Sequence, residues 1–253
     1  MVAAVPPELL DSLRRGEAAV FCGAGLSSLG GAPIGSDLAR DLAQRLASFR
    51  GDTSDLTEVA TVYAALRGRH ALISFLLDAL ARSPMHTTAT HIDLCRLPLA
   101  ALITTNWDDM LERALDSINK DYITVVADST VPFMGAHQTP VIKLHGTLAQ
   151  PETIVVTEKD HYDLFALRPG TTTLLESYFA TKTLLFVGYS LADSDFKRLY
   201  HTCTARFGPL RRRAYAVQLA PTATTVAIWE EQQLEILDSN ATDFISMLSS
   251  SVI

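Results

Sequence analysis

The sequence predicts an α/β protein: a doubly wound, mostly parallel sheet with helices on both faces and an embedded helical subdomain. Several short apolar runs lack alternation of polar and apolar residues, as strands do when both of their faces are buried. In the last third of the chain such runs alternate with helical stretches, and repeated strand–turn–helix units build parallel sheets. A chain of 253 residues is long enough for one large domain of this kind.

The first part of the chain contains one strand and several helices. Two prolines open a short helix over Glu8–Leu13. Ala18–Cys22 is a continuous apolar strand that runs into a glycine-rich turn and then a helical stretch near Ile34–Phe49. From residue 51 to residue 98 the pattern is helical, and we interpret this stretch as an insertion within a single domain that spans the whole chain.

The remaining elements alternate strands with helices. Predicted strands lie at Leu99–Ile103, Tyr122–Val126, Val141–Leu144, Ile154–Val156, Thr183–Val187, Ala214–Leu219 and Leu234–Leu237. Predicted helices lie at Met110–Leu115, Asp193–Arg206, Thr222–Gln233 and Ala241–Leu248. Thr157–Asp160 looks like a helix cap. This order predicts a Rossmann-like sheet with helices on both faces.

Composition and charge exclude several classes of function. The net charge is −7, which argues against nucleic acid as a direct ligand, and no apolar run reaches the roughly 20 residues of a membrane span. The first eight residues lack the features of a signal peptide, so we expect a cytoplasmic protein. The cysteines, Cys22, Cys95 and Cys203, form no CxxC pair, and we expect three reduced, mostly buried thiols rather than a metal site.

Small and polar residues follow four of the apolar strands. They are Gly23-Ala24-Gly25-Leu26-Ser27, Thr105-Asn106-Trp107-Asp108, His145-Gly146 and Gly188-Tyr189-Ser190-Leu191. Ligands of open parallel sheets bind beyond the carboxyl ends of the strands, and glycines there let backbone N–H groups approach a pyrophosphate. The glycine motif alone is weak, because Ser28 stands where the usual fingerprint has a third glycine. The four motifs together predict a ligand site at one edge of the sheet.

In this order and spacing, these motifs and Pro33 resemble sirtuin-like proteins from about Ala18 to Leu199. The versions TTNWD, KLHG and VGYSL look most like the bacterial sirtuin-like NAD hydrolases of antiphage defence. The resemblance implies NAD as the substrate. It also implies that Gly23, Ala24, Gly25, Leu26 and Ser27 cradle the NAD phosphates.

The other motifs receive roles through the same resemblance. Asn106 would hold the nicotinamide ribose or the attacking water, Asp108 would face the nicotinamide amide, and His145 would be the general base. Gly188 and Ser190 would contact the adenosine end. Thr105 and Tyr189, which belong to the same motifs, are included in the NAD-binding set.

Elementary chemistry agrees with these roles. The nicotinamide of NAD is already cationic and needs no strong acid to leave, so the demand is for one positioned nucleophile. The Asn106 amide can orient a hydroxyl and a water together, and an imidazole accepts a proton at neutral pH. We expect His70, His86, His91, His137, His161 and His201 to occupy surface or cap positions. Lys143, on the strand before His145, is expected to face solvent.

Two departures from protein-deacylating sirtuins favour hydrolysis. The chain lacks their four zinc-binding cysteines, so no zinc is expected, and Pro33 is followed by Ile34-Gly35-Ser36-Asp37 rather than by their Pro-Asp-Phe-Arg segment. The leading hypothesis is an NAD glycohydrolase that serves as a latent effector in antiviral defence. A protein deacylase or ADP-ribosyl transferase and a non-catalytic NAD-binding regulatory module remain alternatives.

Latency requires a trigger, because an enzyme that drains NAD harms its own host. We expect an activating protein or nucleotide signal to supply it. We also expect the chain to form a homo-oligomer or to be a subunit of a larger complex.

Overall fold

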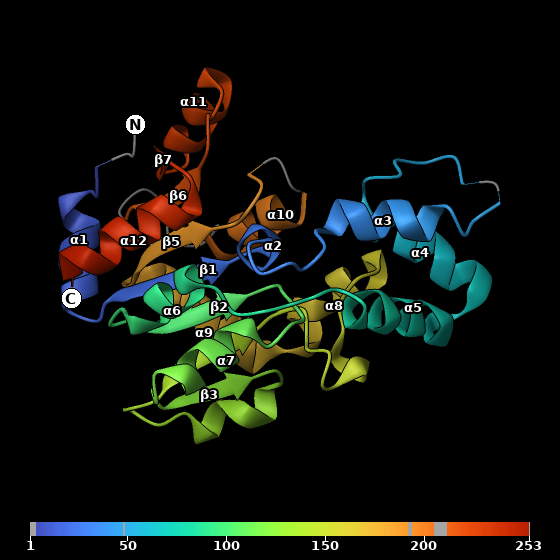
Figure 1. The fold of residues 1–253 in the computed structure, drawn as a ribbon, viewed down its shortest axis with the longest axis horizontal. Helices are drawn as coiled ribbons and strands as arrows, with labels where there is room; N and C mark the ends of the chain where they lie inside the picture. The colour runs from blue at the N-terminus through green and yellow to red at the C-terminus, as the bar shows by residue number, and fades with distance from the viewer. Residues whose placement is uncertain (1–3, 48, 192–193, 205–211, 253) are drawn as a thin grey trace.

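The computed structural model describes residues 4–47, 49–191, 194–204 and 212–252. Within these residues, seven strands form one sheet in the order β3-β4-β2-β1-β5-β6-β7 (Figure 1). The strands are β1 (Ala18–Cys22), β2 (Ala101–Thr104), β3 (Tyr122–Val125), β4 (Thr139–Lys143), β5 (Thr183–Val187), β6 (Ala214–Gln218) and β7 (Leu234–Asp238). Every pairing between neighbours is parallel. The predicted doubly wound α/β fold is confirmed.

The central strand β1 shows why the apolar runs predicted a sheet covered on both faces. All five of its residues are buried. Ala18, Val20 and Cys22 point into one hydrophobic cluster, and Ala19 and Phe21 point into another. Successive strand side chains alternate between the two faces, so a strand with two buried faces must be apolar throughout.

Helices cover both faces of the sheet. One face is covered by α1 (Pro7–Arg14), α6 (Ala89–Arg96), α7 (Met110–Ser117) and α12 (Ala241–Val252). The other is covered by α9 (Pro169–Thr181), α10 (Ser194–Thr204) and α11 (Ala223–Glu231). Of the helix expected at Asp193–Arg206, the first residue and the last two lie outside the described residues.

A third hydrophobic cluster lies beside the sheet, in a group of helices that we call the helical lobe. It consists of α3 (Gly35–Ala43), α4 (Leu56–Arg67) and α5 (Arg69–Ala81), which extend away from the strands (Figure 1). The lobe begins before residue 51, whereas α6, which the 51–98 segment also contains, packs against α7 and α12 on the sheet. The 51–98 insertion as a domain unit stays a prediction.

The largest differences from the predicted elements lie between β4 and β5. The strand expected at Ile154–Val156 is wrong: this segment is irregular, and Ile154 and Val156 are apolar because they pack against the helical lobe. The predicted cap at Thr157–Asp160 is confirmed as a capping box, but the helix that it opens, α8 (Glu158–Leu167), was not predicted, and neither was α9. The glycine turn also contains a one-turn helix, α2 (Ala24–Ser28).

None of the described helices is both long and apolar enough to cross a membrane. The three cysteines are buried and unpaired, as predicted. Burial raises the pKa of the Cys22 thiol and raises those of Cys95 and Cys203 to about 12, so all three thiols stay protonated at neutral pH.

Candidate functional site

A cavity of about 1160 Å³ lies at the carboxyl ends of the strands. Residues that follow β1, β2, β4, β5, β6 and β7 all line it, and residues of the helical lobe line its other side. The chain leaves β1 toward β2 and later returns to β5 on the opposite side of β1, and open α/β sheets bind ligands where the strand order reverses in this way. The cavity is larger than the usual range for small-molecule sites, which suits an extended ligand.

The glycines after β1 allow two loops to approach each other closely. A Cβ atom on Gly23 would lie 2.6 Å from the carbonyl oxygen of Gly188, and one on Gly25 would lie 2.9 Å from the same oxygen. Gly188 has a φ of +73°, and a Cβ atom there would lie 2.3 Å from the Leu26 nitrogen. The glycines therefore join the β1 and β5 loops, in addition to any contact with a ligand.

The predicted phosphate loop offers fewer free amides than its sequence indicates. The N–H groups of Gly23 and Gly25 donate to Val187 and Gly188 carbonyls, each at 2.9 Å, and that of Leu26 donates to Gly23 at 3.0 Å. Ala24, Gly25 and Ser27 line the cavity, whereas the Leu26 side chain is buried in the core. The role of this loop with phosphates stays a prediction.

Asn106 is held in one orientation by its amide nitrogen. Nδ2 donates to the Gly23 carbonyl at 2.9 Å and to the Ser27 hydroxyl at 2.8 Å. The Asn106 backbone N–H donates to Thr104 Oγ1, which in turn donates to the Cys22 carbonyl at 2.8 Å. Both amide hydrogens are thus used within the protein, and Oδ1 is left as the atom that can accept a hydrogen bond from a ligand or water.

Asp108 supports Asn106 through Ser27. The Ser27 hydroxyl donates to Asp108 Oδ2 at 2.7 Å, and the Met110 N–H donates to Oδ1 at 3.0 Å. Asp108 is 8% exposed and lines the cavity, but each of its carboxylate oxygens already has a donor. Its contact with a nicotinamide amide stays a prediction, and the contact that the structure does contain is with Ser27.

Lys143 does not face solvent, so that expectation is wrong. Its side chain is fully buried; it donates to the Asp108 carbonyl and lies 3.3 Å from the carboxylate of Glu112 on α7. A buried ammonium needs such partners, because removing a charge from water is costly. Lys143 therefore anchors the loop that carries Asn106 and Asp108.

His145 lines the same cavity as Asn106. Its carbonyl accepts from the Val155 N–H at 3.0 Å. Burial lowers the pKa of His145 well below its usual value of 6.5, His161 and Arg168 lower it further, and Asp160 opposes them. The imidazole is therefore neutral at physiological pH and able to accept a proton.

The remaining predicted site residues also line the cavity. The Thr105 hydroxyl and the Tyr189 hydroxyl are hydrogen-bonded at 3.1 Å, which links the loops after β2 and β5. Gly188 and Ser190 lie at the end of β5. The structure thus brings together the predicted residues from all four motifs, while their individual ligand contacts stay predictions.

His161 is a site residue that the sequence did not reveal. It was expected at a surface or cap position, but it is 6% exposed, lines the cavity, and has its ring centroid 4.9 Å from that of His145. Its helix was not predicted, and no motif marks it. The assignment of His91 to a cap is confirmed, since its ring completes the capping box of α6, although the side chain is buried.

Other lining residues were also missed. Some come from α4 and the segment just before it, namely Thr57, Asp52 and Asp55. Others follow β7, namely Ser239 and Asn240. Trp107 lies in one of the predicted motifs, but it received no role from the sequence. Its indole Nε1 is buried and has no hydrogen-bond partner among the described residues. The described part of the chain contains no cluster of three or more His, Cys, Asp or Glu side chains arranged to hold a metal ion.

Comparisons with known proteins show which proteins the chain is similar to. The chain is 30% identical over 219 residues to the NAD(+) hydrolase ThsA of Acinetobacter baumannii, covering 83% of this chain and 44% of that protein. It is 29% identical over 211 residues to the NAD(+) hydrolase ThsA of Bacillus cereus, covering 79% and 42%. With the defense-associated sirtuin 2 of Bacillus subtilis it shares 23% identity over 258 residues, covering 96% and 26%.

The chain spans less than half the length of these curated relatives. Residues 100–237 match the model of the SIR2-like domain, and this range contains the motifs after β2, β4 and β5 together with α8. That match covers more than half of the chain. The chain therefore belongs to the SIR2-like domain family.

Proposed function

We propose that this chain hydrolyses NAD at the nicotinamide–ribose bond, releasing nicotinamide and ADP-ribose. The observation that supports this most directly is that the Asn106 carboxamide and the His145 imidazole line one cavity with the glycine loop of β1. Two of the relatives above are named NAD(+) hydrolases, which supports the same reaction. NAD enters as the substrate.

Asn106 positions the reacting groups. Because its Nδ2 atom is bonded to Gly23 and Ser27, its Oδ1 atom accepts a hydrogen bond from a ribose hydroxyl or from the attacking water. A fixed acceptor removes the rotational freedom of the nucleophile before the bond breaks. Such positioning is one of the larger sources of rate enhancement in enzymes.

His145 accepts the proton. When the bond between C1′ and the nicotinamide nitrogen breaks, its electron pair neutralises the pyridinium and nicotinamide leaves uncharged. The water oxygen forms the new bond to C1′, and its proton passes to the neutral imidazole of His145. The lowered pKa of His145 keeps the accepting form populated at neutral pH.

The biological setting that we propose is antiviral defence. One relative is named a defense-associated sirtuin, and uncontrolled loss of NAD would harm the host cell. The enzyme is therefore latent in the cytoplasm, as a homo-oligomer or as a subunit of a larger complex. A protein partner or a nucleotide signal releases its activity.

The test is to incubate the protein with NAD and follow nicotinamide and ADP-ribose by chromatography, with and without an acyl-lysine peptide. NAD loss without peptide, absent in His145→Ala, is the expected result. Cleavage that depends on the peptide would make the chain a deacylase. Tight NAD binding with no turnover, in the isolated protein and in the presence of candidate activators, would make it a binding module.

A further inference from the structure

His161 and His145 form an edge-on pair inside the cavity. Their ring centroids lie 4.9 Å apart with an angle of 82° between the ring planes. His145 follows β4, whereas His161 lies in the first turns of α8, so the contact joins a strand end to a helix that packs against the helical lobe. Both histidines line the cavity in which we propose that NAD binds.

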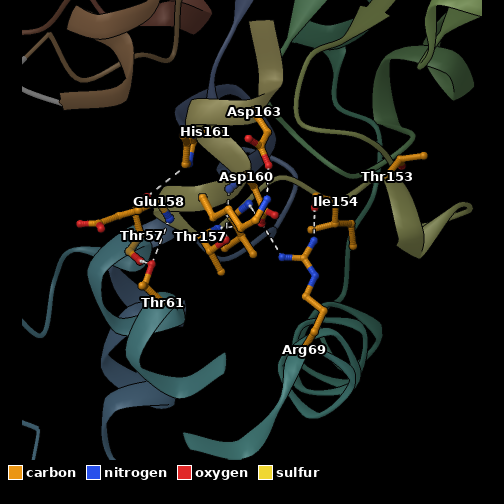
Figure 2. Close-up of polar contacts among 12 residues, drawn as sticks. Thr57, Thr61, Arg69, Thr153, Ile154, Thr157, Glu158, Asp160, His161 and Asp163 are labelled. Atoms are coloured by element: carbon orange, nitrogen blue, oxygen red, sulfur yellow. Dashed lines mark hydrogen bonds and ion pairs between the residues drawn. The ribbon is translucent and has the colours of Figure 1, made fainter. Parts of the chain in front are cut away.

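The helical lobe holds His161 in place. His161 Nε2 lies 3.4 Å from the Thr57 hydroxyl on α4. The Glu158 N–H donates to the Thr61 hydroxyl at 2.9 Å, one turn further along α4. Figure 2 shows that these contacts fix the first turn of α8 against α4.

A second set of contacts joins α8 to α5. The Arg69 guanidinium pairs with the Asp160 carboxylate and donates to the Ile154 carbonyl (Figure 2). Asp160 also accepts from the Thr157 N–H at 2.9 Å, which completes the capping box. The first turn of α8 is therefore bonded to both α4 and α5, and His161 lies in that turn.

The His145 backbone is fixed, but its ring depends on packing. The Leu144 N–H donates to the Thr104 carbonyl at 2.8 Å, and Arg168 donates to the Leu144 carbonyl at 3.0 Å. Within the described part of the chain, no side-chain hydrogen bond to the His145 ring is formed. Among the described residues, the His161 ring is the aromatic group that packs against the His145 ring.

We propose that His161 is a positioning residue for His145, fixing the imidazole of the general base from the helical lobe through Thr57. This inference rests on the proposed hydrolysis of NAD. It gives His161, a residue of α8 that contacts the helical lobe, control over the position of the group that takes the proton from water. Docking of the lobe on α8 thereby sets the geometry of the base.

The charges around His145 and His161 set the pKa of His145, and this pKa is a measurable sign of their contact. Burial lowers the pKa of His145 most, and the positive forms of His161 and Arg168 lower it further. Asp160 opposes them, and Arg69 pairs with Asp160. Asp52, Asp55 and Asp108 line other walls of the same cavity. Because His161 is one of the groups that lower the pKa of His145, replacing it by an uncharged ring removes that contribution, and we expect the pKa of His145 to rise.

The experiment uses His161→Phe, which keeps an aromatic ring, and Thr57→Val, which keeps the shape of the threonine while removing its hydroxyl. His137→Gln, at an exposed histidine, is the matched control. NMR titration of the histidine ring signals follows the pKa of His145 without any turnover. The pH profile of NAD cleavage then gives kcat and KM for each protein that turns over NAD.

We expect the pKa of His145 to rise in His161→Phe and the acid limb of kcat to move to higher pH with it. At alkaline pH, where His145 is neutral in every variant, kcat falls about 10- to 100-fold because the ring is misplaced, and KM changes little. Thr57→Val shows a smaller loss of kcat in the same direction. His137→Gln matches the wild type in both measurements.

An unchanged His145 titration in His161→Phe, or an unchanged kcat at alkaline pH, would overturn the proposal. If His161→Phe does not fold, the kcat of Thr57→Val decides instead, and an unchanged kcat in that variant would overturn the proposal. If the wild type cleaves no NAD under any condition, the proposed function fails. The NMR titration still decides whether His161 acts on His145, so the two failures are distinguishable.

Discussion

The two walls of the cavity are built in different ways. On the wall formed by the strand ends, which we call the rim, Asn106, Ser27 and Asp108 are linked by hydrogen bonds of 2.7 and 2.8 Å, and buried Lys143 holds the same loop. Facing the helical lobe, His145 at the end of β4 contacts the ring of His161 on α8, and His161 Nε2 lies 3.4 Å from the Thr57 hydroxyl on α4. We call these contacts the lobe side.

This contrast shows that the sheet by itself can form the rim but not the lobe side of the site. The rim needs only neighbouring parallel strands in register, because their loops meet automatically at one edge. The lobe side needs helices that are distant in sequence to dock correctly on α8. We therefore expect changes at the rim to cost stability and activity together, and changes on the lobe side to alter mainly the chemistry.

The largest expected effect is on the rim, in Asn106→Ala. Loss of the carboxamide removes the Oδ1 acceptor and leaves the ribose and the water unpositioned. We expect kcat for NAD cleavage to fall about 10²- to 10³-fold, comparable to the loss of one preorganised polar group in other enzymes. Steady-state kinetics measures this, and a kcat within a few-fold of the wild type would contradict the role of Asn106.

Lys143→Met tests the buried ion pair under the rim. The substitution leaves the Glu112 carboxylate, whose side chain is only 12% exposed, without its cation. We expect the free energy of unfolding to drop by about 3–5 kcal/mol, measured by urea denaturation. Adding Glu112→Leu to Lys143→Met removes the unpaired charge and should recover part of the loss. No recovery would mean that the pair is not the cause.

Ser27→Ala breaks the centre of the rim network. Asp108 Oδ2 loses its donor, and Asn106 Nδ2 loses one of its two acceptors. We expect a loss of about 1–3 kcal/mol in stability and a fall in kcat of about tenfold. Ser28→Ala is the matched control, because within the part of the chain that the structure describes that hydroxyl bonds to the Gly25 carbonyl of its own turn and to no other group. Equal effects in the two variants would contradict the network.

The smallest expected effect is the pH dependence of stability that the lobe side introduces. The pKa of His145 is lowered on folding, so below pH 6.5 the unfolded chain takes up a proton that the folded chain does not. Stability therefore falls as pH drops from 6.5 toward that lowered pKa, by at most about 1.4 kcal/mol per pH unit for one histidine.

Thermal unfolding between pH 8 and pH 5 measures this dependence. His145→Gln should flatten the slope but not abolish it, because burial also lowers the pKa of His91. An identical slope in the wild type and in His145→Gln would contradict the buried, neutral state of His145.

The same contrast explains how much could be predicted from the sequence. Every strand of the sheet was predicted to within a few residues. The predicted bounds were correct for β1, whose five residues are all apolar and buried. The candidate residues of the rim followed, since strand ends of one parallel sheet share an edge. The segment Ile154–Val156 was predicted as a strand, but its apolar residues pack against the helical lobe. A short apolar run has no periodicity that distinguishes a buried strand from an irregular segment that packs on a helix.

His161 and Lys143 could not be placed from the sequence for a similar reason. A histidine in a helix carries no signal of the residue that it will face, and His161 acquires its role only when α8 docks beside β4. A lysine in a strand normally indicates a solvent-exposed face. Lys143 is buried because Glu112, on a helix 31 residues earlier, supplies the countercharge.

The most direct test of the central claim is a crystal structure of His145→Ala with NAD. The account predicts that C1′ of the nicotinamide ribose lies beside Asn106 Oδ1, facing the space left by the His145 ring, with the pyrophosphate near Ala24 and Ser27. A complex in which the nicotinamide ribose lies away from Asn106, or in which NAD binds outside this cavity, would contradict it.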